Sequence, residues 1–131
     1  MVAIAEAMPA DKYGYKPTPE VRSFGEIIAH VAGEGRMEME AVAGAPLGSS
    51  ERYESLRDRT EIVRALAEFF DYGATVLANM NDQQALGSAT LRQRQTPRWV
   101  IVMGVIGHNK EHYGNLVTYL RLNNITPPAS Q

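Results

Sequence analysis

The chain has 131 residues, contains no cysteine and carries a formal net charge of −2 at neutral pH. This length suits one domain, expected over residues 1–131, and the lack of thiols excludes disulfides, thiolate metal ligands and a cysteine nucleophile. Acidic and basic residues are interspersed, without the basic patch that nucleic acid requires, and no apolar run reaches the ~18–20 residues of a membrane span, so neither partner is expected.

Helical patterns begin at the first residues of the chain. A short helix is expected over residues 2–8, and it ends before the first proline because proline cannot continue a helix. Ser23 and Glu26 have the spacing of a capping box, in which each side chain accepts a hydrogen bond from the backbone amide of the other residue. The helix that begins there is expected to run to about Val42, and residues 51–58 to add one or two helical turns.

The third long helix has the most regular pattern. Its apolar positions alternate at spacings of four and three, as on the buried face of a bundle helix, and they are Ile62, Leu66, Phe69, Gly73, Val76 and Met80. Further apolar side chains lie beside that face, namely Val63, Phe70 and Leu77. Because a protein rarely leaves such side chains exposed, they predict a homodimer.

The last helix is expected to run from Pro97 to about Leu122, with Thr96 as its N-cap and Asn124 in the left-handed conformation after its end. One stripe is expected to be buried, made by Trp99, Val102, Ile106, Tyr113, Val117 and Leu120. Each interior glycine costs about 1 kcal/mol relative to alanine, which indicates close approach by a neighbouring helix at Gly104, Gly107 and Gly114. No segment alternates with a period of two, so we expect an all-α fold, a four-helix bundle.

The three histidines carry the most specific functional signal. His108 and His112 are four residues apart, which places both imidazoles on one side of the last helix, with β-carbons roughly 5–6 Å apart. If the second helix packs beside it, His30 completes a three-histidine metal site with open coordination positions. The alternative, on spacing alone, is two solvated histidines and one boundary histidine. The stripe that His108 and His112 share with Asn115 and Tyr119 favours the metal site.

Two segments of the chain resemble the DinB-like (DinB/YfiT) family, AEAMPADKYGYKPTPEVRSFGEIIAHVA near the start and HNKEHYGNLVTYLRLNNITPP near the end. The resemblance spans nearly the whole chain and implies an up-up-down-down four-helix bundle that frequently dimerises. It also implies a divalent metal ion, zinc or nickel, bound by one histidine of the second helix and the HxxxH of the last. By position these ligands correspond to His30, His108 and His112.

The chain departs from the family pattern in two places. Family members usually have a full first helix before AEAMPADKY, so the first helix is expected to be shortened here. Asn124 stands where the family often has glycine, and asparagine tolerates the same left-handed backbone. Neither departure affects the three histidines.

Three functions stay open on the sequence. The resemblance implies a metal-dependent transferase, in which the ion lowers the pKa of a low-molecular-weight thiol that attacks a small electrophilic substrate. A metal-dependent hydrolase would need a carboxylate base, and Glu26 and Glu111 are the candidates nearest to the histidines in sequence. Glu26 is better explained as the capping-box partner of Ser23. Glu111 projects about 100° away from His112 around the helix. The third is a non-catalytic, dimeric, stress-associated metal-binding protein. No catalytic residue is identified among these alternatives.

The opening residues bear on location. MVAIAEAMPADKY lacks the basic start and the hydrophobic core of a signal peptide, so a cytoplasmic protein is expected. Because this opening looks like the last turns of a helix, an export signal upstream of this chain is the alternative.

Overall fold

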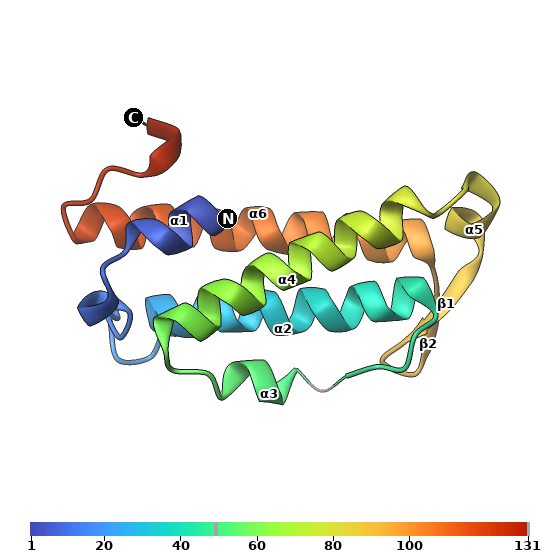
Figure 1. Cartoon of the computed structure of the whole chain (residues 1–131), viewed down its shortest axis with the longest axis horizontal. Helices are drawn as coiled ribbons and strands as arrows, with labels where there is room; N and C mark the ends of the chain where they lie inside the picture. Colours follow the sequence, from blue (N-terminus) through green and yellow to red (C-terminus); the bar gives the residue numbers. More distant parts are fainter. Residues whose placement is uncertain (49, 131) are drawn as a thin grey trace.

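The computed structural model describes residues 1–48 and 50–130, and most of them are helical. Three long helices follow the longest axis of the molecule, α2 (Phe24–Ala43), α4 (Arg59–Ala78) and α6 (Arg98–Leu122) (Figure 1). A short α1 (Val2–Ala7) packs against α4 and α6. The remaining elements are η1 (Ala10–Lys12), α3 (Glu51–Glu54), α5 (Asp82–Leu86), β1 (Ser88–Leu91), β2 (Arg94–Pro97) and η2 (Pro128–Ser130). None of the described helices is long and apolar enough to cross a membrane.

The helix directions differ from the expected up-up-down-down order. In Figure 1, α1 and α6 run one way along the axis, whereas α2 and α4 run the other way. The connection between α2 and α4 explains this, because it carries α3 back along the outside of α2 before α4 begins, and α4 therefore starts at the same end as α2. The connections before α2 and after α4 simply reverse the chain.

The start of α2 confirms the predicted capping box. The Glu26 amide donates to Ser23 Oγ at 3.2 Å, and the Ser23 amide donates to Glu26 Oε2 at 2.7 Å. The helix ends at Gly44, whose φ of 69° is the left-handed conformation that glycine adopts without strain. The core lies between α2, α4 and α6, with fully buried side chains from each, including Phe24, Ile28, Leu66 and Leu116.

The buried face of α4 confirms most of the predicted pattern. Ile62, Leu66, Phe69 and Gly73 are buried, while Val76 and Met80 are half-buried. The second apolar set divides into two kinds of residue: Val63 and Phe70 pack against the core, and Leu77 is exposed.

The predicted apolar stripe of α6 is confirmed in part. Leu120 is buried, and Val102, Tyr113 and Val117 are partly buried and pack against the core, whereas Trp99 is 50% exposed and Ile106 is 41% exposed. The fully buried apolar residues of α6 are Ile101, Val105, Leu116, Tyr119 and Leu120. Apolar residues occur on every side of α6, so the helical period alone did not identify a single face.

The interior glycines of α6 also differ from expectation. A Cβ added at Gly104, Gly107 or Gly114 would meet nothing within 4 Å, so no neighbouring helix approaches there. The close approach is on α2, where a Cβ on Gly35 would lie 2.4 Å from Cζ of the Phe69 ring. Gly35 therefore allows α4 to pack directly on the backbone of α2.

A β-hairpin lies between α5 and α6, in a fold for which no strand was expected. Strands β1 and β2 pair antiparallel from Ser88 opposite Pro97 to Leu91 opposite Arg94. The two turn residues Arg92 and Gln93 have φ of 48° and 64°, as in the two-residue turns that join paired strands. The strand continues to Pro97, so Pro97 is the N-cap of α6 and Thr96 does not cap it. Asn124 has the expected positive φ of 59°.

Candidate metal centre

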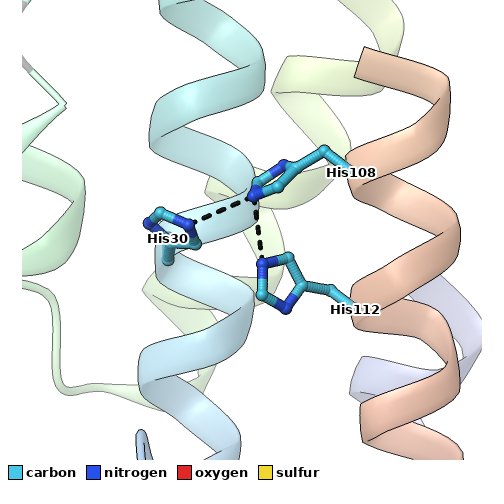
Figure 2. A group of neighbouring side chains, drawn as sticks. All are labelled: His30, His108 and His112. Carbon is cyan, nitrogen blue, oxygen red and sulfur yellow. Dashed lines mark hydrogen bonds between the residues drawn. The ribbon is translucent and has the colours of Figure 1, made fainter. Parts of the chain in front are cut away.

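The three histidines meet between α2 and α6. Their side chains point toward one another across the gap between the two helices (Figure 2). Nε2 of His108 lies 3.2 Å from Nε2 of His30 and 3.0 Å from Nε2 of His112. The three rings stand nearly perpendicular to one another, at interplanar angles of 76° to 89°. The structure therefore brings the three histidines together, as the HxxxH spacing and a facing second helix led us to expect.

Hydrogen bonds among the rings cannot satisfy this cluster. An imidazole nitrogen offers one in-plane position, which holds either a proton to donate or a lone pair to accept. His108 Nε2 faces two other Nε2 atoms, so it can bond to one of them only. One cation that accepts a lone pair from each ring would remove the conflict, and three imidazole nitrogens are a donor set suited to zinc or nickel.

The surroundings favour neutral rings, which are the form that binds metal. Burial is the main cause that lowers the pKa of His112 to about 4, and the charges of His108 and His30 lower it further. Burial and the charge of His30 likewise lower the pKa of His108. In the absence of metal both rings are therefore ready to donate a lone pair near neutral pH.

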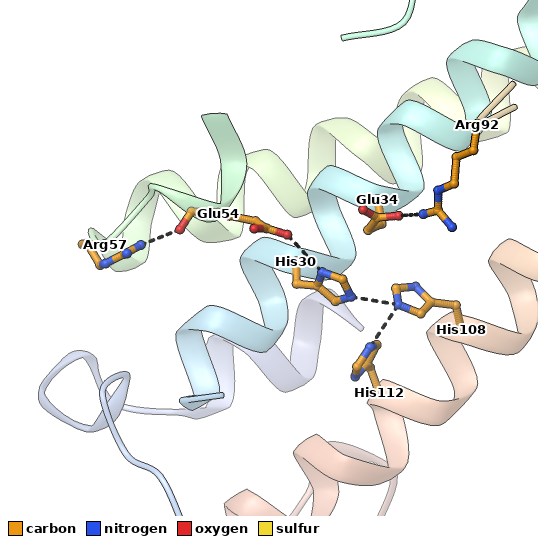
Figure 3. A network of polar contacts seen from close by, with 7 residues as sticks. All are labelled: His30, Glu34, Glu54, Arg57, Arg92, His108 and His112. Carbon is orange, nitrogen blue, oxygen red and sulfur yellow. Dashed lines mark hydrogen bonds and ion pairs between the residues drawn. The ribbon is translucent and has the colours of Figure 1, made fainter. Parts of the chain in front are cut away.

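The outer nitrogens of two rings have their own partners. His30 Nδ1 lies 3.3 Å from Oε1 of Glu54, a residue of α3 (Figure 3). Asn115 Nδ2 lies 3.5 Å from His112 Nδ1, and because amide oxygen and nitrogen exchange by a half-turn of the side chain, Asn115 can equally present Oδ1 to an Nδ1 proton. Such acceptors on the far side of a ring fix the tautomer in which Nε2 carries the lone pair.

Two carboxylates near the site escaped the sequence analysis. Glu34 and Glu54 offer oxygens that lie, with a ring nitrogen of His30, within 4.8 Å of one another. Glu34 forms an ion pair with Arg92 at the tip of the hairpin (Figure 3). The spacing of four between His30 and Glu34 could have indicated Glu34, but no spacing indicates Glu54, which lies on a separate helix.

The carboxylates that were considered as bases have other roles. Glu26 belongs to the capping box and pairs with Lys16 at 3.1 Å. Glu111 is exposed on α6, and only its charge reaches the site, where it acts to raise the pKa of His108 and His112. Neither belongs to the groups of possible metal ligands among residues 1–48 and 50–130.

Comparisons with known proteins agree with the fold. A crystal structure of a DinB-like protein from Bacillus cereus superposes with a TM-score of 0.82 at 13% identity, over 97% of this chain and 85% of that one. A DinB-like protein from Bacillus subtilis gives 0.75 at 17% identity, over 94% and 82%. No curated protein matches the sequence. The family model of the DinB superfamily matches residues 1–116, and the chain therefore belongs to the DinB superfamily.

Proposed function

We propose that this protein binds one divalent metal ion through His30, His108 and His112. The observation that carries the proposal is the convergence of three Nε2 atoms, with separations of 3.0 and 3.2 Å that ring-to-ring hydrogen bonds cannot satisfy together. Neutral imidazoles suit zinc or nickel, and no cysteine is present to compete for the ion. The histidines leave coordination positions open for a further ligand.

We also propose that α1, α2, α4 and α6 are the four helices of the family's bundle and that the protein is a homodimer. Support for the dimer comes from α6, which exposes the large apolar side chains of Trp99, Met103 and Ile106. A contiguous patch of this kind commonly marks a protein interface.

The activity that we propose is metal-dependent transfer to a low-molecular-weight thiol. A bound divalent ion supplies positive charge that lowers the pKa of a thiol or water beside it. In the transfer, the thiol sulfur forms a bond to an electrophilic carbon, its proton passes to solvent, and the leaving group departs with its bonding electrons. The chain itself has no thiol, so a small molecule must supply the sulfur.

The carboxylates around the site favour transfer over hydrolysis. Glu54 contacts His30 Nδ1, and Glu34 pairs with Arg92. Each is thus held as a partner of another side chain, whereas a hydrolase needs a carboxylate that is free to accept a proton from water.

Metal content and thiol transfer test the proposal together. Purified protein should hold about one zinc or nickel ion per chain, and His112→Ala should lose tight binding, whereas Lys110→Ala, at an exposed position of the same helix, should keep it. The loaded protein should conjugate a small thiol to a reactive electrophile faster than metal-free protein. Stoichiometric metal at this site in a triple histidine-to-alanine variant would contradict the assignment. Full metal loading without any acceleration would leave the non-catalytic alternative.

A further inference from the structure

A hollow of about 510 Å³ opens beside the histidine cluster. His112, Asn115 and Tyr119 of α6 line one side of it, Ile27 of α2 lies on another, and residues 17–22 form the opposite wall. Its volume is in the range of sites that hold small molecules, roughly 300–1,000 Å³. Because His112 belongs both to this lining and to the cluster, the hollow adjoins the proposed metal centre.

The wall opposite α6 is held in place at several points. The Tyr119 hydroxyl donates to the backbone carbonyl of Arg22 at 2.8 Å, which ties the wall to α6 across the hollow. The next residue, Ser23, is fixed in the capping box of α2, and the Phe24 amide donates to the Tyr15 carbonyl at 3.0 Å. The backbone at Arg22 is therefore positioned before any ligand arrives.

Arg22 is the basic residue in the lining of this hollow. Within residues 1–48 and 50–130 its guanidinium makes no ion pair, and two nearby carboxylates already have partners, Glu26 with Lys16 and Glu54 with His30. Glu20 also lines the hollow, but it is exposed, and its carboxylate accepts hydrogen bonds from its own backbone and from Thr18. The positive charge of Arg22 also acts on the cluster, because it contributes to lowering the pKa of both His108 and His112.

We propose that this hollow binds a small molecule that carries a carboxylate, with Arg22 recognising the carboxylate while the other end of the molecule reaches the metal centre beside His112. A guanidinium binds a carboxylate through two parallel N–H···O bonds, which gives a preference over neutral groups. The inference rests on the proposed metal site and narrows its substrate class to acidic thiols or acidic electrophiles.

Matched thiols test the preference directly. Cobalt-loaded protein is titrated with 3-mercaptopropionate against 3-mercaptopropanol, and with 6-mercaptohexanoate against 6-mercaptohexanol, and the sulfur-to-metal charge-transfer band gives each dissociation constant. At one or both chain lengths the carboxylate should bind about tenfold more tightly than the alcohol. The six-carbon acid cannot close a small chelate ring on the ion, so its preference reports the protein. Added salt should reduce the preference because Arg22 is exposed.

Three variants separate recognition from general charge and from misfolding. Arg22→Gln should remove the preference and leave alcohol binding unchanged, while Arg22→Lys should keep part of it because the charge remains. Arg64→Gln removes one positive charge from an exposed position of α4 and should behave as the wild type. A preference that persists in Arg22→Gln, or is absent from the wild type at both lengths, overturns the proposal.

A second titration keeps the inference distinct from the proposed transferase activity. Zinc-loaded and metal-free proteins labelled with ¹⁵N are titrated with hexanoate and with hexanol, and the amide shifts of residues 17–22 and Asn115 are followed. Shifts with hexanoate that vanish in Arg22→Gln support the carboxylate site even if no thiol gives a charge-transfer band, in which case the thiol activity alone fails. Hexanoate shifts that are equal in the wild type and in Arg22→Gln contradict the role of Arg22, whatever the thiols do.

Discussion

Oε1 of Glu54 lies 3.3 Å from Nδ1 of His30, on the side of the ring that faces away from the other two histidines. The contact joins α3, in the connection between α2 and α4, to the histidine cluster between α2 and α6. A carboxylate in this place holds the Nδ1 proton and leaves the Nε2 lone pair for a metal ion. The returning connection thus contributes to the chemistry of the site as well as to the path of the chain.

Replacing Glu54 with glutamine should weaken metal binding without abolishing it. Loss of a carboxylate partner behind a ligating histidine typically costs about 10–100-fold in affinity, and the partial exposure of Glu54 points to the lower end. Competition with a chromophoric chelator measures the dissociation constant. Glu68→Gln, an exposed change on α4, serves as the control and should leave the affinity unchanged. Equal affinities in both variants would show that the Glu54 contact does not tune the site.

The metal-free protein should lose stability between pH 6.5 and 5. Burial and neighbouring histidines lower the pKa of folded His112 to about 4, from 6.5 in the absence of such effects. In this window the unfolded chain binds more protons than the folded one, so the free energy of unfolding must fall as the pH falls. Each unit of difference in pKa is worth about 1.4 kcal/mol.

Urea unfolding of chelator-treated protein across that window measures this slope. His112→Gln removes the titrating ring while keeping a polar side chain, and its slope should be smaller than that of the wild type. The window lies above the range in which most carboxylates titrate, so the difference reports the histidine. Identical slopes for the two proteins would contradict the lowered pKa.

The sequence predicted the pairing of His108 with His112 because its determinant is local, whereas His30 was expected to join them only if the second helix packs beside the last one. Four-residue spacing places His108 and His112 on one side of a helix whatever the rest of the fold does. The capping box at Ser23 is equally local, and its geometry was found as expected. The contact of Glu54 with His30 depends on how a connection packs, and no periodicity encodes that.

The hairpin and the full set of buried residues of α6 were not predicted correctly, because the local sequence does not determine either of them. The hairpin was missed because SATL and RQTP are short and mostly polar, and its turn, Arg92 and Gln93, lacks the Asn-Gly type of signal that marks such turns. The buried residues of α6 were predicted only in part because apolar side chains occur all around that helix. Hydrophobic patterns identify the core only when the opposite side of the helix is polar.

The contrast between two glycines can be measured with alanine substitutions. Gly35→Ala places a Cβ within 2.4 to 2.8 Å of three atoms of the buried Phe69 ring, so it should destabilise the protein by about 1–3 kcal/mol. Gly107→Ala meets no atom within 4 Å and gains helix propensity, so it should stabilise by roughly 1 kcal/mol. Denaturant unfolding gives both values. In a Phe69→Leu background, which replaces the ring with a smaller side chain, Gly35→Ala should cost less stability than it does in the wild type.

The homodimer should form through α6 and not through the face of α4 that the sequence suggested. On α6, Trp99, Met103 and Ile106 recur at helical spacing and are 50%, 56% and 41% exposed, whereas Val63 and Phe70 of α4 pack into the core. Met103→Glu places a charge in the centre of the exposed patch and should dissociate the dimer, because an unpaired carboxylate is costly to bury. Leu77→Glu, on the α4 side, should leave the dimer intact. Sedimentation at micromolar concentration distinguishes the cases. If Leu77→Glu dissociates the dimer and Met103→Glu does not, the interface lies on α4. A monomeric wild type would contradict the dimer altogether.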